Sequence, residues 1–258
     1  MLAVICKSSN KKMKLKFLIF FLVISSFTLT AQNMVSNEIL QRVFYIKYGS
    51  NTGSCFLVSI DSADYLITAK HLFPTTLANK TPVDIEILRN DGWLKLKSNY
   101  LIHTNPNIDI AVLDLKSNDQ KNNLFDIGSK SYYLSQECFF LGFPFGLRMD
   151  DKEGKMNNGF PLPFVKKAII SSFISDSTHM TQIFLDGHNN PGFSGGPVVI
   201  TNYEAGSKHK MRIIGIVSAY LNEEKIIKTP LGDFKNSENS GIVLSYAFDH
   251  VIEIIKDK

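Results

Sequence analysis

Short apolar runs separated by polar turns make up most of the chain after residue 38. In the first half, each run has four to six residues and is rich in β-branched and aromatic side chains. These runs are 42–46, 55–60, 65–68, 83–88, 93–96, 100–103 and 110–115. Runs of this length between Gly-, Asn- and Asp-containing turns are typical of strands in an all-β barrel or sandwich.

The second half repeats the pattern after a polar segment at 116–123, which we interpret as a linker between two halves. Its predicted strands are 138–142, 167–174, 181–185, 197–200, 212–218 and 241–245. A polar stretch at 148–159 predicts a surface loop. Only the tail at 246–255 has helical spacing, with its apolar residues on one face. The pattern therefore predicts an all-β protein with one short C-terminal helix.

Residues 1–31 differ in composition from the rest of the chain. They hold five lysines and no acidic residue, so the formal charge of +4 for the whole chain becomes −1 for 32–258. A lysine-rich start, an apolar segment at 17–30 and Ala31 before Gln32 predict a cleaved secretory signal peptide. No cysteine directly follows, so we expect no lipid attachment. The alternative is an uncleaved membrane anchor.

This leader determines the expected location and partners. We predict a secreted or periplasmic protein with no stable membrane span after cleavage of the signal peptide. Because the excess of basic residues belongs to the leader, the charge gives no reason to expect a nucleic-acid partner.

Two cysteines, Cys55 and Cys138, lie beyond the leader. A disulfide between them is compatible with an oxidising compartment. Both cysteines also lie in apolar strand-like runs, where free buried cysteine is equally common. The sequence leaves these two alternatives open. No Cys/His spacing resembles a zinc site, and we expect neither a metal nor another cofactor.

A serine flanked by glycines precedes one of the predicted strands. Ser194 lies in the sequence P-G-F-S-G-G-P at 191–197. Glycines allow backbone angles that other residues avoid, and they allow a substrate to approach the main chain closely. Such a turn can present a hydroxyl nucleophile together with backbone N–H groups, which is what acyl transfer requires. The alternative is a tight glycine turn leading into a strand.

A serine hydroxyl needs a base to act as a nucleophile at neutral pH. Among six histidines, His71 is the preferred candidate because it closes a predicted strand in the run T-A-K-H. Asp109 opens the apolar run D-I-A-V-L and can accept a hydrogen bond from an imidazole N–H. Taken singly, each has a simpler interpretation, as a strand-end histidine and as a solvated aspartate.

The three motifs together are more specific. T-A-x-H, D-I-A-V-L and G-x-S-G-G-P follow in the order His, Asp, Ser, with gaps of 38 and 85 residues. They resemble the trypsin-like serine peptidases of the chymotrypsin fold, and within these the bacterial branch related to the HtrA (Deg) proteases. The resemblance implies two six-stranded Greek-key β-barrels with the active site between them. The first barrel would occupy 38–120, and the second, with the terminal helix, 128–258.

The resemblance also implies a role for each residue of the site. Ser194 would attack the scissile carbonyl, His71 would transfer its proton, and Asp109 would orient the imidazole. The backbone N–H groups of Gly192 and Ser194 would form the oxyanion hole. The expected substrate-binding residues are His188, Ser218 and Tyr220.

Several positions depart from the family pattern. His188 stands at the base of the primary pocket, where an aspartate would select Lys or Arg, so we expect an uncharged or small P1 residue. Phe193 stands where many members have an aspartate that pairs with a freed N-terminus, so zymogen-style activation is not expected. Lys70 replaces a small residue before His71. No PDZ domain is expected, because the chain ends at Lys258.

These observations predict an exported serine endopeptidase that acts on polypeptide substrates, and they leave its oligomeric state open. One alternative is a protease-fold binding or scaffold module with an inactive or gated site. Another takes G-x-S-x-G as the elbow of an α/β-hydrolase esterase. The esterase is disfavoured, because that elbow opens a helix and a predicted strand follows Ser194 here.

Overall fold

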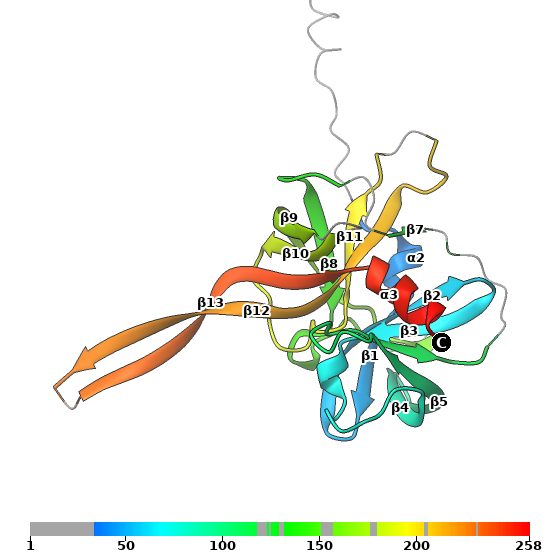
Figure 1. Ribbon diagram of the computed structural model, residues 1–258, viewed down its shortest axis with the longest axis horizontal. Coiled ribbons are helices and arrows are strands. Elements are labelled where there is room, and N and C mark those ends of the chain that lie inside the picture. Colours follow the sequence, from blue (N-terminus) through cyan, green and yellow to red (C-terminus); the bar gives the residue numbers. More distant parts are fainter. Residues whose placement is uncertain are drawn as a thin grey trace, which may run out of the picture. The chain divides into compact units, whose positions relative to one another are not determined.

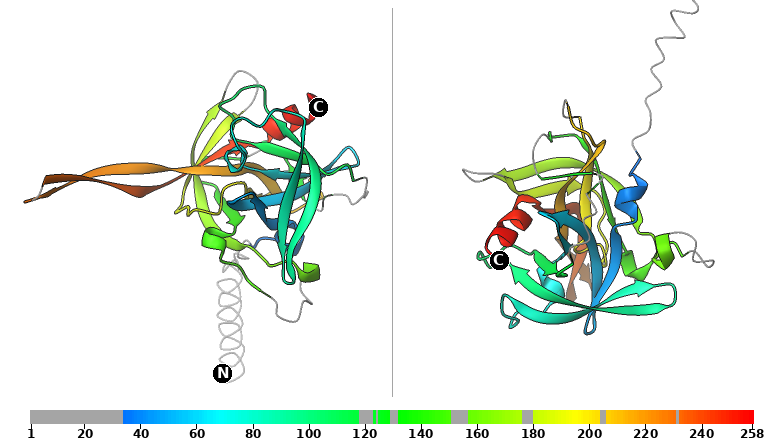
Figure 2. Two further views of the ribbon diagram at one scale, coloured as in Figure 1. Left: turned by 90° about the horizontal axis from the view of Figure 1, so that it is seen from below. Right: turned by 90° about the vertical axis from the view of Figure 1, so that its right-hand side faces the viewer.

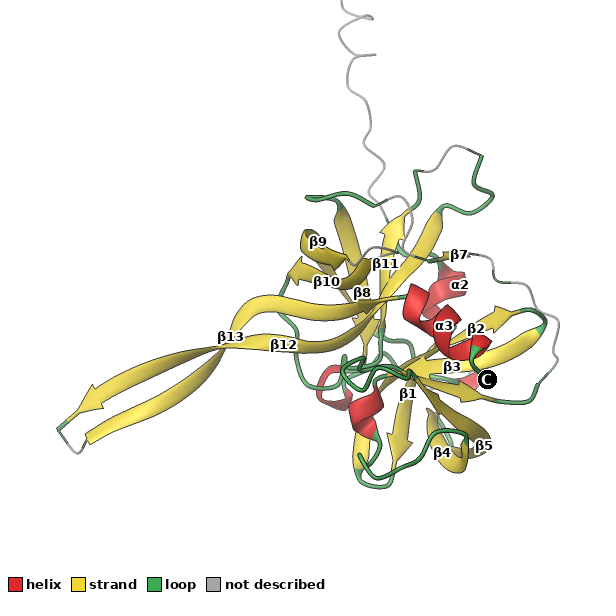
Figure 3. Ribbon diagram, viewed as in Figure 1, coloured by secondary structure: helices red, strands yellow, loops and turns green. Residues whose placement is uncertain are grey.

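The computed structural model describes residues 34–117, 123, 125–128, 132–150, 157–175, 180–203, 206–230 and 232–258. Strands dominate these residues, as Figures 1 and 3 show. The predicted signal peptide at 1–31 and most of the predicted linker lie outside the described residues. None of the described helices has the length and apolar character needed to cross a membrane.

Six antiparallel strands of the first half close into a barrel. They are β1 (Val43–Tyr48), β2 (Asn51–Ile60), β3 (Ala63–Thr68), β4 (Thr81–Arg89), β5 (Gly92–Ile102) and β6 (Ala111–Asp114). Their order around the barrel is β1-β2-β3-β6-β5-β4. Two runs predicted as separate strands, 93–96 and 100–103, merge into β5, because the polar residues between them continue the ladder with β4.

The second half forms a sheet with the same strand order. Its strands are β7 (Asp126–Ile127), β8 (Glu137–Gly142), β9 (Phe164–Ser175), β10 (Met180–Asp186), β11 (Pro197–Thr201), β12 (Met211–Thr229) and β13 (Gly232–Ala247). The order is β11-β8-β9-β10-β13-β12, closed by pairing of β11 with β12, while β7 adds in parallel to β12. The predicted pair of six-stranded Greek-key barrels is confirmed.

The helices are short. They are α2 (Asn37–Leu40), the 3-10 turns η1 (Lys70–Leu72), η2 (Pro144–Gly146) and η3 (Asn157–Gly159), and α3 (Asp249–Lys256). The C-terminal helix was predicted to start at 246. It starts later because Tyr246 and Ala247 still belong to β13, where they pair with Ile216 and Gly215 of β12.

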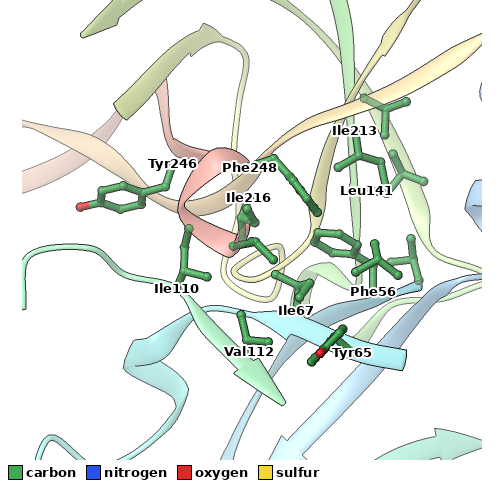
Figure 4. Close-up of a cluster of buried hydrophobic side chains, with 14 of the residues drawn as sticks. Phe56, Tyr65, Ile67, Ile110, Val112, Leu141, Ile213, Ile216, Tyr246 and Phe248 are labelled. Carbon is green, nitrogen blue, oxygen red and sulfur yellow. The ribbon is translucent and has the colours of Figure 1, made fainter. Parts of the chain in front are cut away.

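An apolar core joins the two barrels and α3. Figure 4 shows part of this cluster: Phe56 and Ile67 come from the first barrel, and Leu141 and Ile216 come from the second. Val251 on α3 packs into the same cluster. Because both barrels contribute buried side chains to it, their contact surface is itself a hydrophobic core.

Each barrel also has a core of its own, and each contains one cysteine. Cys55 packs in the first-barrel cluster and Cys138 in the second-barrel cluster, and both side chains are fully buried. Both thiols are free, so the disulfide that the sequence left open is not formed. Burial raises the pKa of both thiols, that of Cys138 to about 12.

A long two-stranded ribbon extends from the second barrel. Beyond the predicted strands at 212–218 and 241–245, β12 and β13 stay paired until Thr229 meets Gly232. Figures 1 and 2 show this ribbon reaching away from the barrel. Side chains at 221–228 are exposed, and Lys225 and Glu238 form an ion pair across the ribbon at 2.6 Å. With both faces in solvent, the ribbon lacks the apolar alternation that marks a half-buried strand.

Candidate active site

Asp109 holds His71 by both its backbone and its ring. His71 lies in η1, the single turn that follows β3. Its backbone N–H donates to Oδ1 of Asp109 at 2.9 Å, and its Nδ1 lies 2.7 Å from Oδ2. Since a carboxylate only accepts hydrogen bonds, Nδ1 carries the hydrogen. The Nε2 lone pair is therefore the basic position of this histidine.

Ser218 on β12 makes a third hydrogen bond to this carboxylate. Its hydroxyl donates to Oδ2 of Asp109 at 2.5 Å. Burial alone would raise the pKa of Asp109, but hydrogen bonds from His71 and Ser218, together with the charge of the imidazolium, outweigh burial and lower it. Asp109 thus stays ionised at neutral pH, where it can stabilise a protonated His71.

Ser194 also contacts Ser218 of β12. Its hydroxyl donates to the backbone oxygen of Ser218 at 3.0 Å. Ser218 therefore contacts Asp109 through its side chain and Ser194 through its main chain. Among the described residues, this is the bond that the Ser194 hydroxyl makes, and His71 is not its partner. To lose its proton to His71, the hydroxyl must turn from the Ser218 carbonyl towards Nε2.

The loop before Ser194 forms a turn that orients a backbone amide. Phe193 N–H donates to the Asn190 oxygen at 3.2 Å, and Gly192 has a φ of +107°. Proline followed by glycine at the two central positions is typical of a type II turn. The Pro191 oxygen accepts the Phe145 N–H at 2.8 Å, so the N–H of Gly192, in the same trans peptide unit, points the opposite way.

Within the described part of the chain, the N–H groups of Gly192 and Ser194 donate to no protein acceptor. No protein acceptor therefore competes for these two groups, and their role as an oxyanion hole stays a prediction. Position 192 also tolerates only glycine. A Cβ there would lie 2.2 Å from the backbone oxygen of Phe143, and the positive φ would strain any other residue.

Ser54 on β2 connects the first barrel to this loop, and the sequence analysis missed it. Its hydroxyl donates to the Gly192 oxygen at 2.7 Å and accepts the Phe143 N–H at 3.0 Å. Its backbone N–H donates to the Ser194 oxygen at 2.8 Å. Ser54 is fully buried, so each of these bonds satisfies a group that water cannot reach. Nothing in its local sequence marks this role.

Phe193 replaces the expected charged anchor with an apolar one. Its side chain is fully buried in the second-barrel core. Its ring meets Phe140 edge-to-face, with the ring centroids 4.9 Å apart. Burial of an aromatic side chain contributes about 2 to 3 kcal/mol, so the loop is held without an ion pair at this position.

The residues predicted to bind substrate lie around this loop and β12. His188 is exposed, while its neighbour Asn189 is buried and donates from Nδ2 to the Ala219 oxygen at 3.1 Å. Tyr220 is partly buried and pairs with Val243. The structure thus places His188 beside the segment of β12 that follows Ser218.

A cluster of potential metal ligands lies at the C-terminal helix α3. His103, His250 and Glu253 have ligand atoms within 4.8 Å of one another. The Asn105 N–H donates to Nδ1 of His103, so Nε2 of that ring carries a hydrogen and donates to Glu253 at 3.0 Å. A metal ion on Nε2 would have to displace this hydrogen. The contacts fit a carboxylate shared by two histidines better than a metal site.

The chain has the two Greek-key barrels of chymotrypsin-fold proteins. His71 and Asp109 belong to the first barrel, and Ser194 belongs to the second. Residues 53–206 match the family model of the trypsin-like peptidase domain, and the chain belongs to this family. The all-β fold excludes the α/β-hydrolase alternative, since Ser194 leads into strand β11.

Solved structures agree on the fold. The HtrA-type protease AlgW with a tripeptide is similar with a TM-score of 0.52 and 22% identity over 86% of this chain, and the match spans 62% of the AlgW chain. An inactive form of Rv3671c from M. tuberculosis H37Rv is similar with a TM-score of 0.52 and 13% identity, over 89% of this chain and 92% of that one. No curated protein matches this chain significantly.

Proposed function

We propose that this protein is an exported serine endopeptidase that hydrolyses peptide bonds in polypeptides through an acyl-enzyme. The observation that carries the proposal is the chain of hydrogen bonds from His71 through Asp109 and Ser218 to Ser194. It joins a base, an orienting carboxylate and a hydroxyl beside two N–H groups that donate to no protein acceptor. Acyl transfer needs these groups together.

Each group has one task in the proposed reaction. The Ser194 hydroxyl attacks the scissile carbonyl while Nε2 of His71 accepts its proton, and Asp109 stabilises the resulting imidazolium. The N–H groups of Gly192 and Ser194 stabilise the oxyanion of the tetrahedral intermediate, where each donor is worth about 2.7 to 4 kcal/mol. His71 then gives its proton to the leaving amine. Water then attacks the acyl-enzyme by the same steps and releases the acyl group.

Labelling with a fluorescent phosphonate tests this proposal directly. Wild-type protein should be labelled between about pH 6 and 9, and Ser194→Ala should not. Ser237→Ala is a matched control, because Ser237 is exposed on the ribbon, and it should be labelled like the wild type. Folded wild-type protein that resists labelling over this whole pH range would refute the proposal.

A binding or scaffold function is the second candidate, and one observation favours it. The Ser194 hydroxyl donates to the Ser218 carbonyl and not to His71. Hydrogen bonds in sites without substrate often tighten only when substrate binds, so this geometry is compatible with both functions. A protein that captures unfolded polypeptides but resists labelling in their presence supports the scaffold. Labelling that accelerates when a peptide is added supports a gated peptidase.

Export and specificity need separate measurements. Expression with the leader, followed by N-terminal sequencing of the protein outside the cytoplasm, should give a mature chain that starts near Gln32. Cleavage of a proteome-derived peptide library should show uncharged or small P1 residues, because His188 stands where an aspartate would select a basic one. Cleavage mainly after Lys or Arg would contradict this specificity.

A further inference from the structure

The turn at Asn190–Phe193 sets the direction of the Gly192 N–H, yet it lacks the charged anchor expected from the family. Lys166 on β9, a partly buried residue, contacts this turn from the second barrel. It pairs with Phe140 across β8 and β9, and residues directly opposite in a ladder share a face of the sheet. Because Phe140 is fully buried in the second-barrel core, the Lys166 side chain faces the same interior.

Lys166 contacts the loop at three points. Its Nζ donates to the His188 oxygen and to Oδ1 of Asn190, both at 2.6 Å. The same ammonium lies 5.5 Å from the centroid of the Phe193 ring, a distance at which a cation and an aromatic ring attract each other. Lys166 thus contacts Asn190 and Phe193, the first and last residues of the turn, and His188, which lies two positions before it.

The chemistry of these contacts suits a fixed loop. Hydrogen bonds from a charged donor are about twice as strong as neutral ones. Burial lowers the pKa of Lys166, because the ammonium group is partly withdrawn from water. The neighbouring Lys167 differs, because it is exposed and pairs with Glu137 at 2.5 Å on the surface.

We propose that Lys166 is a positioning residue that holds the Asn190–Phe193 turn in the conformation that directs the Gly192 N–H towards the oxyanion. It acts through the loop and touches no reacting atom. In this protein a partly buried cation thus does the work that an aspartate paired with a freed N-terminus would do. The turn is then held without any cleavage of the chain. The inference rests on the proposed peptidase function.

Lys166→Met tests this inference, with Lys167→Met as the matched control on the same strand. Methionine keeps most of the apolar stem and removes the donor and the charge. Loss of one oxyanion donor costs about 100- to 1,000-fold in kcat, so a loosened turn should lower kcat by about 10- to 100-fold. KM should stay within about threefold, because the turn acts on the transition state. Lys167→Met should match the wild type.

Two further measurements separate positioning from a general loss of structure. Affinity for a peptide boronate, which mimics the tetrahedral intermediate, should fall in proportion to kcat/KM in Lys166→Met, while affinity for a product peptide should not change. Lys166→Arg keeps the charge and several donors, and should recover kcat to within about fivefold of the wild type. A Lys166→Met variant that folds and keeps wild-type kcat would overturn the proposal.

Other measurements test Lys166 if the variant does not fold or if the wild-type protein is inactive. If Lys166→Met does not fold, Asn190→Ala removes one of the contacts while keeping Lys166, and an unchanged kcat in that variant would overturn the proposal. If wild-type protein is inactive, the peptidase function fails, but amide hydrogen exchange of the segment 188–194 still tests Lys166. Exchange there should be at least about tenfold faster in Lys166→Met than in Lys167→Met. Equal exchange would count against Lys166.

Discussion

Replacing Asp109 by asparagine tests the chemistry of the site most directly, because the variant keeps the shape of the side chain. The carboxylate accepts three hydrogen bonds: the backbone N–H and Nδ1–H of His71, and the hydroxyl of Ser218. An amide has only one acceptor oxygen. If that oxygen stays with the backbone N–H, the amide NH₂ group faces Nδ1 and Ser218.

The amide NH₂ group of the variant forces His71 into the other tautomer. Nδ1 must then accept a hydrogen bond, so the hydrogen moves to Nε2, which can no longer accept the Ser194 proton. In triads of this kind the change lowers kcat by about 10,000-fold, which corresponds to about 5.4 kcal/mol of transition-state stabilisation. The Ser218 hydroxyl can rotate to accept from the new amide, so we expect the fold to persist.

Two assays follow from this reasoning. The rate of phosphonate labelling and kcat on a cleaved peptide should both fall by about 10,000-fold in Asp109→Asn. The folded-state pKa of Asp109 is lowered, so its ionised form stabilises the protein above the unfolded pKa of about 3.9, and this stability is lost as the pH falls through the folded pKa. Wild type should therefore melt at a higher temperature than the variant at pH 7, and the gap should close in acid.

A clear result would refute the argument. A folded Asp109→Asn variant that keeps more than about one tenth of the wild-type kcat would show that the carboxylate does not set the tautomer of the base. A melting-temperature gap that widens in acid would contradict the linkage between Asp109 and stability.

Three other substitutions or treatments have defined outcomes. Ser218→Ala removes a charge-assisted hydrogen bond to Asp109 and should raise the midpoint pH of acid unfolding, which circular dichroism measures; an unchanged midpoint would be evidence against that bond. Ser54→Ala leaves the buried N–H of Phe143 unpaired and should lower the free energy of unfolding in urea by about 1 to 3 kcal/mol. A decrease near zero would mean that the hydroxyl is dispensable. The buried thiols of Cys55 and Cys138 should react with a thiol reagent only in guanidinium, and rapid labelling of native protein would contradict their burial.

The short apolar runs were sufficient to predict most strands of both barrels, because these strands bury much of their length, while the closure into two barrels was inferred from the family resemblance. The ribbon formed by the outer parts of β12 and β13 could not be predicted in this way. Its side chains lie in solvent on both faces and are joined by cross-strand pairs such as Lys225 and Glu238. Such pairs depend on register, which a single strand does not reveal.

The motif order located His71, Asp109 and Ser194, and the structure brings them together through Ser218. It could not locate Ser54, because the partner of its hydroxyl, the Gly192 oxygen, lies 138 residues further along the chain. Backbone oxygens carry no sequence signal, so a side chain that binds them has no recognisable partner. The same holds for Lys166, which binds the main chain of His188.

Ser54 and Ser218 each form a hydrogen bond to a part of the site that belongs to the other barrel. The first barrel supplies the hydroxyl that holds the loop of Ser194, and the second supplies the hydroxyl that holds Asp109. Each half therefore completes the other's share of the site, and neither contains a working catalyst alone. A chain whose halves have separated would carry every residue of the proposed site and yet would not cleave its neighbours. We therefore expect proteolytic activity only when the two halves are docked.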